Sequence, residues 1–265
     1  MTRIGTSGFS FQSWRGQVYP HSLPMEKLFD YYVQVLGFDS VELNYTFYRQ
    51  PSQKTAESFL RRSPENFDFT AKVHRSVTHE PENSDTKRNL DSFIAGLSPL
   101  IDSGKLGCLL AQFPPGFLPS RASVNRILRL REWSHPIPVA FEFRHRAWFR
   151  EEALQLLGEA DVCICAADLP ELGSLPPFQP VPSSGHAYLR LHGRNRNWYS
   201  NGSRYDYLYS EPELRSFLPV IADCERNGRT VRIFFNNCHA GHAARNAVLM
   251  RRLLNESSPT LPLQT

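Results

Sequence analysis

Eight apolar runs in this sequence each end in a polar or charged residue of a type that binds ligands or transfers protons. Segments with the apolar spacing of helices separate these runs, so strands and helices alternate along the chain. This order predicts an α/β fold in which parallel strands close into a single (β/α)8 barrel of the TIM type. Because the carboxyl ends of the strands meet at one mouth of such a barrel, we expect the site there. The residues that end the runs are Ser7, Asn44, His74, Gln112, Arg144, Asp168, His192 and Asn236.

The alternation of side chains along each strand indicates which residues face the interior of the barrel. One interpretation of the inward charges is that they only neutralise one another, since buried charges need partners. Burying several ions is costly, however, so their retention favours a function. We therefore predict catalytic roles for Glu42, Lys72, Glu142, Asp168 and His192. Parity puts four polar pairs inside, namely Glu42 with Asn44, Lys72 with His74, Glu142 with Arg144, and Arg190 with His192.

His192 is the main candidate for proton transfer, because it shares the inward parity of Arg190 and precedes Gly193. Glu142, Asp168 and His192 could also converge as ligands of a divalent metal ion. The lysine and arginine side chains in the same layer would repel such an ion. A metal is therefore possible but not favoured, and the sequence identifies no cofactor.

Two loops after the last strands combine residues that bind phosphate groups and rings. The first, over residues 194–209, alternates basic and aromatic side chains, and it could either contact a ligand or pack as a lid on the barrel rim. The second leads from the eighth strand into a helix, an arrangement that frequently binds phosphate in barrels. With the strand ends, these loops give the predicted substrate-binding set: Asn44, His74, Gln112, Arg144, Arg190, Arg194, Trp198, Tyr199, Asn236, Asn237 and Arg245.

The length of 265 residues suits one barrel domain spanning residues 1–265. No window approaches the roughly 18 consecutive apolar residues of a membrane span. The first residues enter a strand directly and lack the features of a secretory signal. We therefore expect a cytoplasmic protein with no membrane partner. Its net charge of +4 permits a small anionic molecule or a nucleic acid as partner.

Two local features refine this prediction. The five cysteines are odd in number, and three of them fall inside strands, which indicates reduced thiols in the core. The stretch 169–184 is rich in proline, so we expect an irregular loop where the sixth helix of a barrel would lie.

Short motifs spread over nearly the whole chain carry a family resemblance. They are GTSGF at 5–9, VELNYTFY at 41–48, QFPP at 112–115, FEFRH at 141–145, LHGR at 191–194 and FNN at 235–237. With these motifs the chain resembles the DUF72 family, also called YecE-like, which implies a β/α barrel. That family has been likened to sugar isomerase and endonuclease IV type barrels, which bind metals through carboxylates and histidines. This chain has Asn236 and Asn237 at the eighth strand, so the resemblance does not extend to a multinuclear zinc site.

Three functions fit these residues. The first is an enzyme that binds a small anionic or polyhydroxylated substrate, such as a sugar phosphate, and transfers protons through carboxylates and histidine. It would be a lyase, an isomerase or a hydrolase. The second is a nucleic-acid-binding or phosphodiester-processing protein of the endonuclease IV type, with or without a metal. The third is a metabolite sensor or a partner-binding barrel, which would bind its ligand without turnover. No feature of the sequence indicates an oligomeric state.

Overall fold

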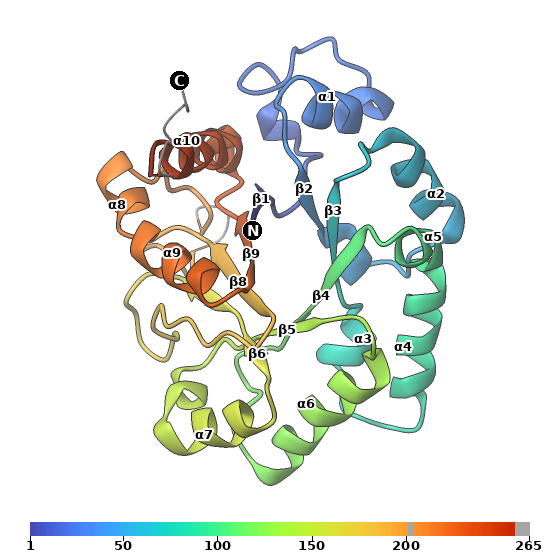
Figure 1. Ribbon diagram of the computed structural model, residues 1–265, viewed down its shortest axis with the longest axis vertical. Coiled ribbons are helices and arrows are strands. Elements are labelled where there is room, and N and C mark those ends of the chain that lie inside the picture. The colour runs from blue at the N-terminus through green and yellow to red at the C-terminus, as the bar shows by residue number, and fades with distance from the viewer. Residues whose placement is uncertain (201–203, 258–265) are drawn as a thin grey trace, which may run out of the picture.

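Parallel strands line the inside of the structure and helices surround them, in the computed structural model of residues 1–200 and 204–257 (Figure 1). The strands are β1 (Thr2–Thr6), β2 (Ser40–Leu43), β3 (Asp68–Lys72), β4 (Leu106–Gln112), β5 (Val139–Glu142), β6 (Cys163–Ile164), β7 (Ala166–Asp168), β8 (His186–Leu191) and β9 (Thr230–Phe235). One sheet has the order β1-β9-β8-β7, and the other has the order β2-β3-β4-β5-β6. All pairings between these strands are parallel.

The two sheets meet on both sides without a continuous ladder. On one side a single parallel bridge joins Ser7, just after β1, to Glu42 in β2. On the other side β6 and β7 are successive parts of one run that is interrupted at Cys165. There the Ile164 N–H donates to the carbonyl of Val181 at 2.8 Å. Val181 belongs to the connection between β7 and β8, so this connection, and not a neighbouring strand, bonds Ile164 on that side. The predicted α/β class and parallel strands are confirmed, whereas the described residues form two sheets and not one closed ladder.

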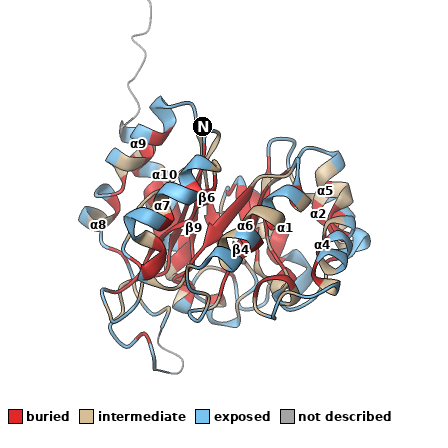
Figure 2. Cartoon of the chain, turned by 90° about the horizontal axis from the view of Figure 1, so that it is seen from below, coloured by how far each residue is buried: buried red, intermediate tan, exposed pale blue. Residues whose placement is uncertain are grey.

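Helices form the outer layer, with buried faces toward the strands and exposed faces outward (Figure 2). Ser120 accepts a hydrogen bond from the backbone N–H of Ser123 and so caps the helix that follows. No helix in the described part of the chain is long and apolar enough to cross a bilayer. The helices are η1 (Gln12–Trp14), η2 (Met25–Lys27), α1 (Leu28–Gln34), η3 (Asn44–Phe47), α2 (Gln53–Arg62), α3 (Arg75–Thr78), α4 (Asp85–Gly96), α5 (Ser98–Asp102), α6 (Arg121–Ser134), η4 (Arg146–Phe149), α7 (Glu151–Glu159), α8 (Glu211–Arg215), α9 (Leu218–Arg226), η5 (His239–Gly241) and α10 (His242–Ser257).

The connection between β7 and β8 is irregular, as its prolines predicted, and residues 169–185 contain no helix.

Beneath the carboxyl ends of the strands, a cluster of small and apolar side chains fills the interior. All five cysteines are buried and free, in agreement with the prediction of reduced thiols. Burial raises the pKa of Cys108 to about 12, so this thiol is protonated and inert at neutral pH. The members of the cluster are Cys108, Leu110, Ala140, Cys163, Cys165, Tyr188 and Phe234.

Candidate functional site

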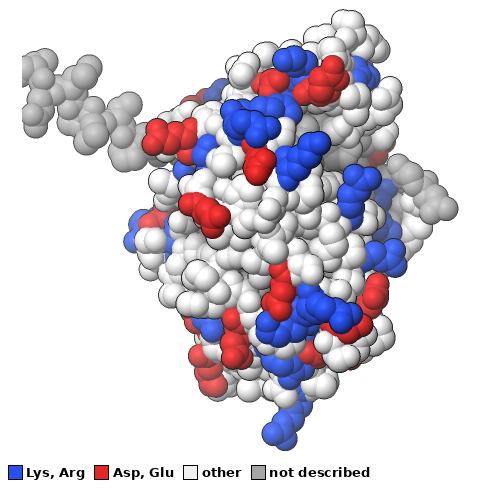
Figure 3. Space-filling view, turned by 90° about the vertical axis from the view of Figure 1, so that its right-hand side faces the viewer, with Lys and Arg blue, Asp and Glu red and all other residues white. Residues whose placement is uncertain are grey.

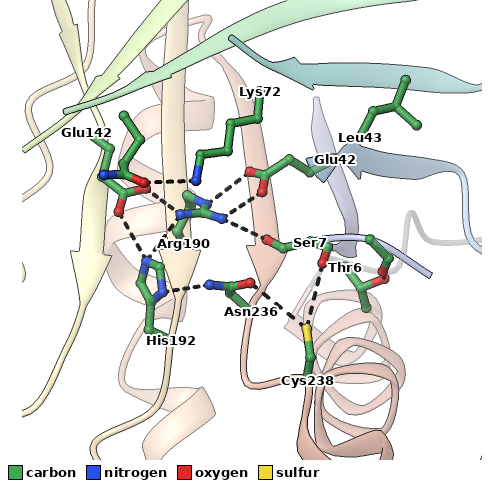
Figure 4. A network of polar contacts seen from close by, with 12 residues as sticks. Thr6, Ser7, Glu42, Leu43, Lys72, Glu142, Arg190, His192, Asn236 and Cys238 are labelled. Atoms are coloured by element: carbon green, nitrogen blue, oxygen red, sulfur yellow. Dashed lines mark hydrogen bonds and ion pairs between the residues drawn. The ribbon is translucent and has the colours of Figure 1, made fainter. Parts of the chain in front are cut away.

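Three charged residues that parity predicted to face inward form one buried cluster at the strand ends (Figure 4). Arg190 holds Glu42 in a bidentate pair, with Nη2 2.7 Å from Oε1 and Nε 3.0 Å from Oε2. The Nη1 atom of Arg190 lies 2.5 Å from Oε2 of Glu142. The side chains of both glutamates are 0% exposed, and that of Arg190 is 1% exposed. Since Arg190 lies in β8 and the glutamates lie in β2 and β5, this cluster links the two sheets.

Two hydroxyl groups complete the surroundings of this cluster. Tyr188 Oη donates to Glu42 Oε2 at 2.7 Å, and it reaches this atom because alternate residues of β8 face the same side. Arg190 Nη2 also lies 3.3 Å from Ser7 Oγ. Both oxygens of Glu42 therefore have buried donors, and this carboxylate is not available to a ligand. Its role in the fold is to neutralise and orient Arg190.

The second oxygen of Glu142, Oε1, faces Arg144 and His192. Arg144 Nε lies 2.5 Å from it, in an ion pair without the alignment of a hydrogen bond, and His192 Nε2 lies 3.4 Å from it. Burial alone would raise the pKa of Glu142, but the charges of Arg144 and Arg190 outweigh it and hold that pKa well below the usual range. Glu142 is therefore ionised at neutral pH.

The surroundings of His192 do not suit the proton-transfer role that the sequence predicted for it. Burial, assisted by the charge of Arg144, lowers the pKa of His192 to about 3. Its Nδ1 lies 2.9 Å from Asn236 Nδ2, so with the amide donating, the imidazole proton is on Nε2 and faces Glu142. A neutral, fully buried imidazole fits a positioning role for Glu142 better than proton exchange with a ligand.

Lys72 lies at the strand ends beside the buried cluster, and its side chain lines a pocket there. Its Nζ donates to Gln112 Oε1 at 2.8 Å and lies 4.3 Å from the centre of the Phe47 ring. Burial, together with the charges of Arg190 and Arg144, lowers the pKa of Lys72 to about 7. A substantial fraction of its amine is therefore unprotonated at neutral pH and can act as a base or nucleophile.

A pocket of 760 Å³ opens above the buried cluster at the mouth formed by the strand ends. All of the formally charged residues that line it, among those described, are cations: Lys72, Arg75, Arg144, Arg190 and Arg204. Aromatic side chains surround these cations, and two of them, Tyr48 and Tyr199, are 76% and 67% exposed. We call this the mouth pocket. A second cavity, of 600 Å³, lies at the amino ends of the strands beside Val139 and His186 and contains none of the predicted site residues.

The structure brings most of the predicted site residues together. Glu42, Glu142 and His192 lie buried beneath the mouth pocket. The carbonyl oxygen of the Asn44 side chain is buried at the pocket and has no hydrogen-bond partner among the described residues, so it could accept from a ligand. The predicted residues that line the pocket are Asn44, Lys72, Gln112, Arg144, Arg190, Trp198, Tyr199 and Asn236.

Asp168 lies elsewhere, on the helix side of its strand. Both of its oxygens accept from Arg194 at 2.9 to 3.1 Å, and Tyr209 Oη donates to it at 2.6 Å. The reason is alternation, because Cys163 and Cys165 face the interior and Asp168 has the opposite parity. The structure therefore corrects the predicted catalytic position of Asp168 and the ligand-contacting position of Arg194, which together anchor the loop after β8.

Three other predicted residues also lie outside the mouth pocket. His74 caps α3, where its Nδ1 accepts from the backbone N–H of Ser76 at 3.3 Å. Asn237 donates to the carbonyl of Tyr207 at 2.8 Å and to Asn246 Oδ1 at 2.9 Å. Arg245 donates to Gln17 Oε1 at 2.7 Å on the surface. His74 therefore serves as a helix cap, and Asn237 and Arg245 bond residues elsewhere in the chain. The structure corrects their predicted position, because none of the three lines the mouth pocket.

Several pocket residues were not predicted. Arg75 begins α3 and His79 directly follows it. Arg204 and Tyr205 come from the loop after β8, which was predicted as a possible ligand contact without naming these two residues. Burial, followed by the charge of Lys72, lowers the pKa of His79 to about 4. The signal that could have identified them is their position within one helical turn or one loop of a predicted strand end.

The fold and the site together define a class: a parallel α/β protein whose strand ends hold an arginine and two carboxylates under a cationic pocket. The chain belongs to the DUF72 family, because the family model described as "Protein of unknown function DUF72" matches residues 3–265. This match confirms the resemblance that the motifs indicated.

Known relatives agree with this assignment. The crystal structure of a DUF72 family protein from Thermotoga maritima is 41% identical, with a TM-score of 0.88 over 96% of this chain and 99% of that one. A DUF72 family protein from Enterococcus faecalis shares the fold at 24% identity, with a TM-score of 0.84 over 100% of this chain and 99% of that chain. The UPF0759 protein YunF of Bacillus subtilis is 28% identical over 285 residues, which cover 100% of this chain and 99% of that protein.

Proposed function

We propose that the mouth pocket binds a small anionic molecule and that the protein is an enzyme acting on it. The observation that carries this proposal is the charge of the pocket lining, which among the described residues includes five cations and no carboxylate. The carboxylates beneath it neutralise Arg190 and approach Arg144, which leaves the charges of the outer cations for a ligand. Phosphate and carboxylate groups are the anions that arginine binds best.

The amide side chains of the pocket favour a substrate that also carries hydroxyl or carbonyl oxygens. Asn44, Gln112 and Asn236 lie among the cations, and amides both donate to and accept from such groups. A sugar phosphate combines these features. We further propose that Lys72 exchanges the proton in the reaction, since its amine lies in the pocket and the buried glutamates do not.

We also propose that the two sheets act as one barrel. The Ser7–Glu42 bridge joins them on one side, and Arg190 links them across the interior. Such a barrel would hold its site at the carboxyl ends of the strands, where the mouth pocket lies.

Replacement of Arg144 by glutamine tests the anion site. We expect the variant to bind sulfate about 10- to 100-fold more weakly than the wild type, because a charge-assisted hydrogen bond is lost and Arg144 no longer offsets the charge of Glu142 beneath the pocket. Isothermal titration calorimetry measures the affinity, and the exposed Arg121→Gln variant on α6 is the matched control. Equal sulfate affinity of the Arg144→Gln variant, with an unchanged melting temperature, would remove Arg144 from the proposed site.

Sulfate affinity is also expected to depend on pH through Lys72. An anion stabilises the protonated amine, so binding raises a pKa that is about 7 in the free protein. The affinity should be greatest below pH 7 and fall by up to about tenfold per pH unit above it, until the pKa of the bound state is reached. Sulfate does not titrate in this range, and a Lys72→Met variant should lack the dependence. A wild-type affinity that is constant from pH 6 to pH 9 would contradict this role of Lys72.

Nucleic-acid binding is the second candidate, and the aromatic rim of the pocket favours it. The Arg204 guanidinium lies 5.1 Å from the Trp198 ring, and Tyr199 is exposed beside them, which resembles the surfaces on which bases stack. Figure 3 shows another side of the molecule, that of α2, α4 and α5, where basic and acidic side chains are interspersed. Binding of a single-stranded oligonucleotide that weakens steeply with salt would favour this candidate over the small anion.

A further inference from the structure

We propose that Asp206, His239 and His242 form a binding site for a divalent transition-metal ion of the zinc class. Asp206 Oδ1 lies 3.0 Å from His239 Nδ1 and 3.2 Å from His242 Nε2. All three ligand atoms lie within 4.8 Å of one another. Neighbouring ligands of a tetrahedral zinc ion are about 3.3 Å apart, given bonds of about 2.0 Å. Small side-chain rotations would therefore place the three atoms around one ion.

The backbone explains how the two histidines come together. They flank a kink between η5 and α10, where Ala240 and Gly241 have φ of 46° and 80°. A Cβ atom on Gly241 would lie 2.5 Å from a methyl group of Val18, so only glycine fits this turn. The imidazole rings lie with their centroids 5.8 Å apart. Asp206 reaches them from the loop after β8, so the site joins two segments that are distant in sequence.

The chemistry of the ligands favours zinc-class ions over magnesium or calcium. Two imidazole nitrogens and one carboxylate oxygen suit zinc, cobalt, nickel or copper, whereas hard cations prefer sites made of oxygen. Three protein ligands leave one tetrahedral position for water or another molecule. The site is open to solvent, because the side chains of His239 and Asp206 are 46% and 45% exposed.

This site is distinct from the buried cluster but adjoins the mouth pocket. Tyr205 and Cys238, the sequence neighbours of Asp206 and His239, line that pocket. A bound ion would tie the loop after β8 to the start of α10 and add positive charge at the rim. Metal binding at this site is independent of the proposed function, because none of the three ligands is a residue assigned to anion binding.

Metal titration tests this site. Protein dialysed against EDTA should bind one equivalent of Co²⁺ with the intense visible absorption of a low-symmetry, four-coordinate site, and Zn²⁺ should displace it. Asp206→Asn, His239→Ala and His242→Ala should each weaken Zn²⁺ binding at least about tenfold. The control is His21→Ala, which removes an exposed histidine outside the group.

The variants should keep the circular dichroism and melting temperature of the wild type in EDTA, which separates metal binding from folding. Zn²⁺ binding that is unchanged in both His239→Ala and His242→Ala would overturn the proposal. So would a wild-type titration without saturation. Weaker sulfate binding together with normal Zn²⁺ binding in the Arg144→Gln variant would show that the metal site and the anion site are independent.

Discussion

Replacement of Arg190 by methionine is expected to lower the free energy of unfolding by about 3–5 kcal/mol, because it leaves two buried carboxylates without their shared counter-charge. Glu42 would lose both of its guanidinium hydrogen bonds and keep only the hydroxyl of Tyr188. Urea unfolding at pH 7, followed by circular dichroism, measures the change.

Two controls separate this effect from the loss of a large buried side chain. Arg232→Met removes an arginine that pairs with Asp68, whose side chain is 12% exposed, so water can replace part of the interaction and the loss should be smaller. Replacing Glu42 by glutamine together with Arg190→Met should recover much of the stability, since Glu142 keeps Arg144 as its counter-charge and no unpaired carboxylate remains buried. If Arg190→Met and Arg232→Met lower the free energy of unfolding by the same amount, the contribution of the central cluster to stability does not come from its charges.

The stability of the Arg190→Met variant should also change with pH in a defined direction. In the wild type the pKa of Glu142 lies well below the usual range, so its contribution is present above about pH 4.5 and is lost as the pH falls further. Without Arg190, Glu142 keeps Arg144 but loses the second charge that lowers its pKa, so this pKa should be higher in the variant than in the wild type. Protonation of Glu142 would then offset part of the lost stability of the variant as the pH falls. The difference between the two proteins should therefore shrink between pH 7 and pH 4.

The residues on regular strands could be placed from the sequence, because alternation has a period of two. It put Glu42, Glu142, Arg190 and Lys72 on the inner face, and the structure agrees. The same rule applied to Cys163 and Cys165 assigns Asp168 to the helix side, so this error arose from reading the residue type without the parity.

The partners of the loop residues could not be read from the sequence. Arg194 pairs with Asp168, and Arg245 bonds Gln17, which is 228 positions away. Such pairs depend on how separate segments pack, and a basic residue near a strand end has no local feature that distinguishes a ligand contact from an internal one. Closure of the sheets was unpredictable for a similar reason, since Val181 from an irregular connection pairs with Ile164.

Lys72 is expected to be the lysine most reactive toward an anionic aldehyde at pH 7. With glyoxylate and cyanoborohydride, the neutral amine adds to the aldehyde carbon, water leaves, and the reagent delivers hydride to the resulting imine. About half of the Lys72 amines are neutral at pH 7, against about one in 2,500 for a lysine with a pKa of about 10.4. Its lower basicity offsets part of this advantage, so we expect modification about 10- to 100-fold faster than at exposed Lys54.

Peptide mass spectrometry measures the two rates, and sulfate as a competitor makes the experiment specific. Lys72 should be protected by sulfate while Lys54 is not, because only Lys72 shares a pocket with Arg144. Equal rates at the two lysines would mean that the amine of Lys72 is protonated or inaccessible. Selective modification that sulfate suppresses would place a free amine and an anion in one pocket, and the proposed proton transfer requires both to be present there together.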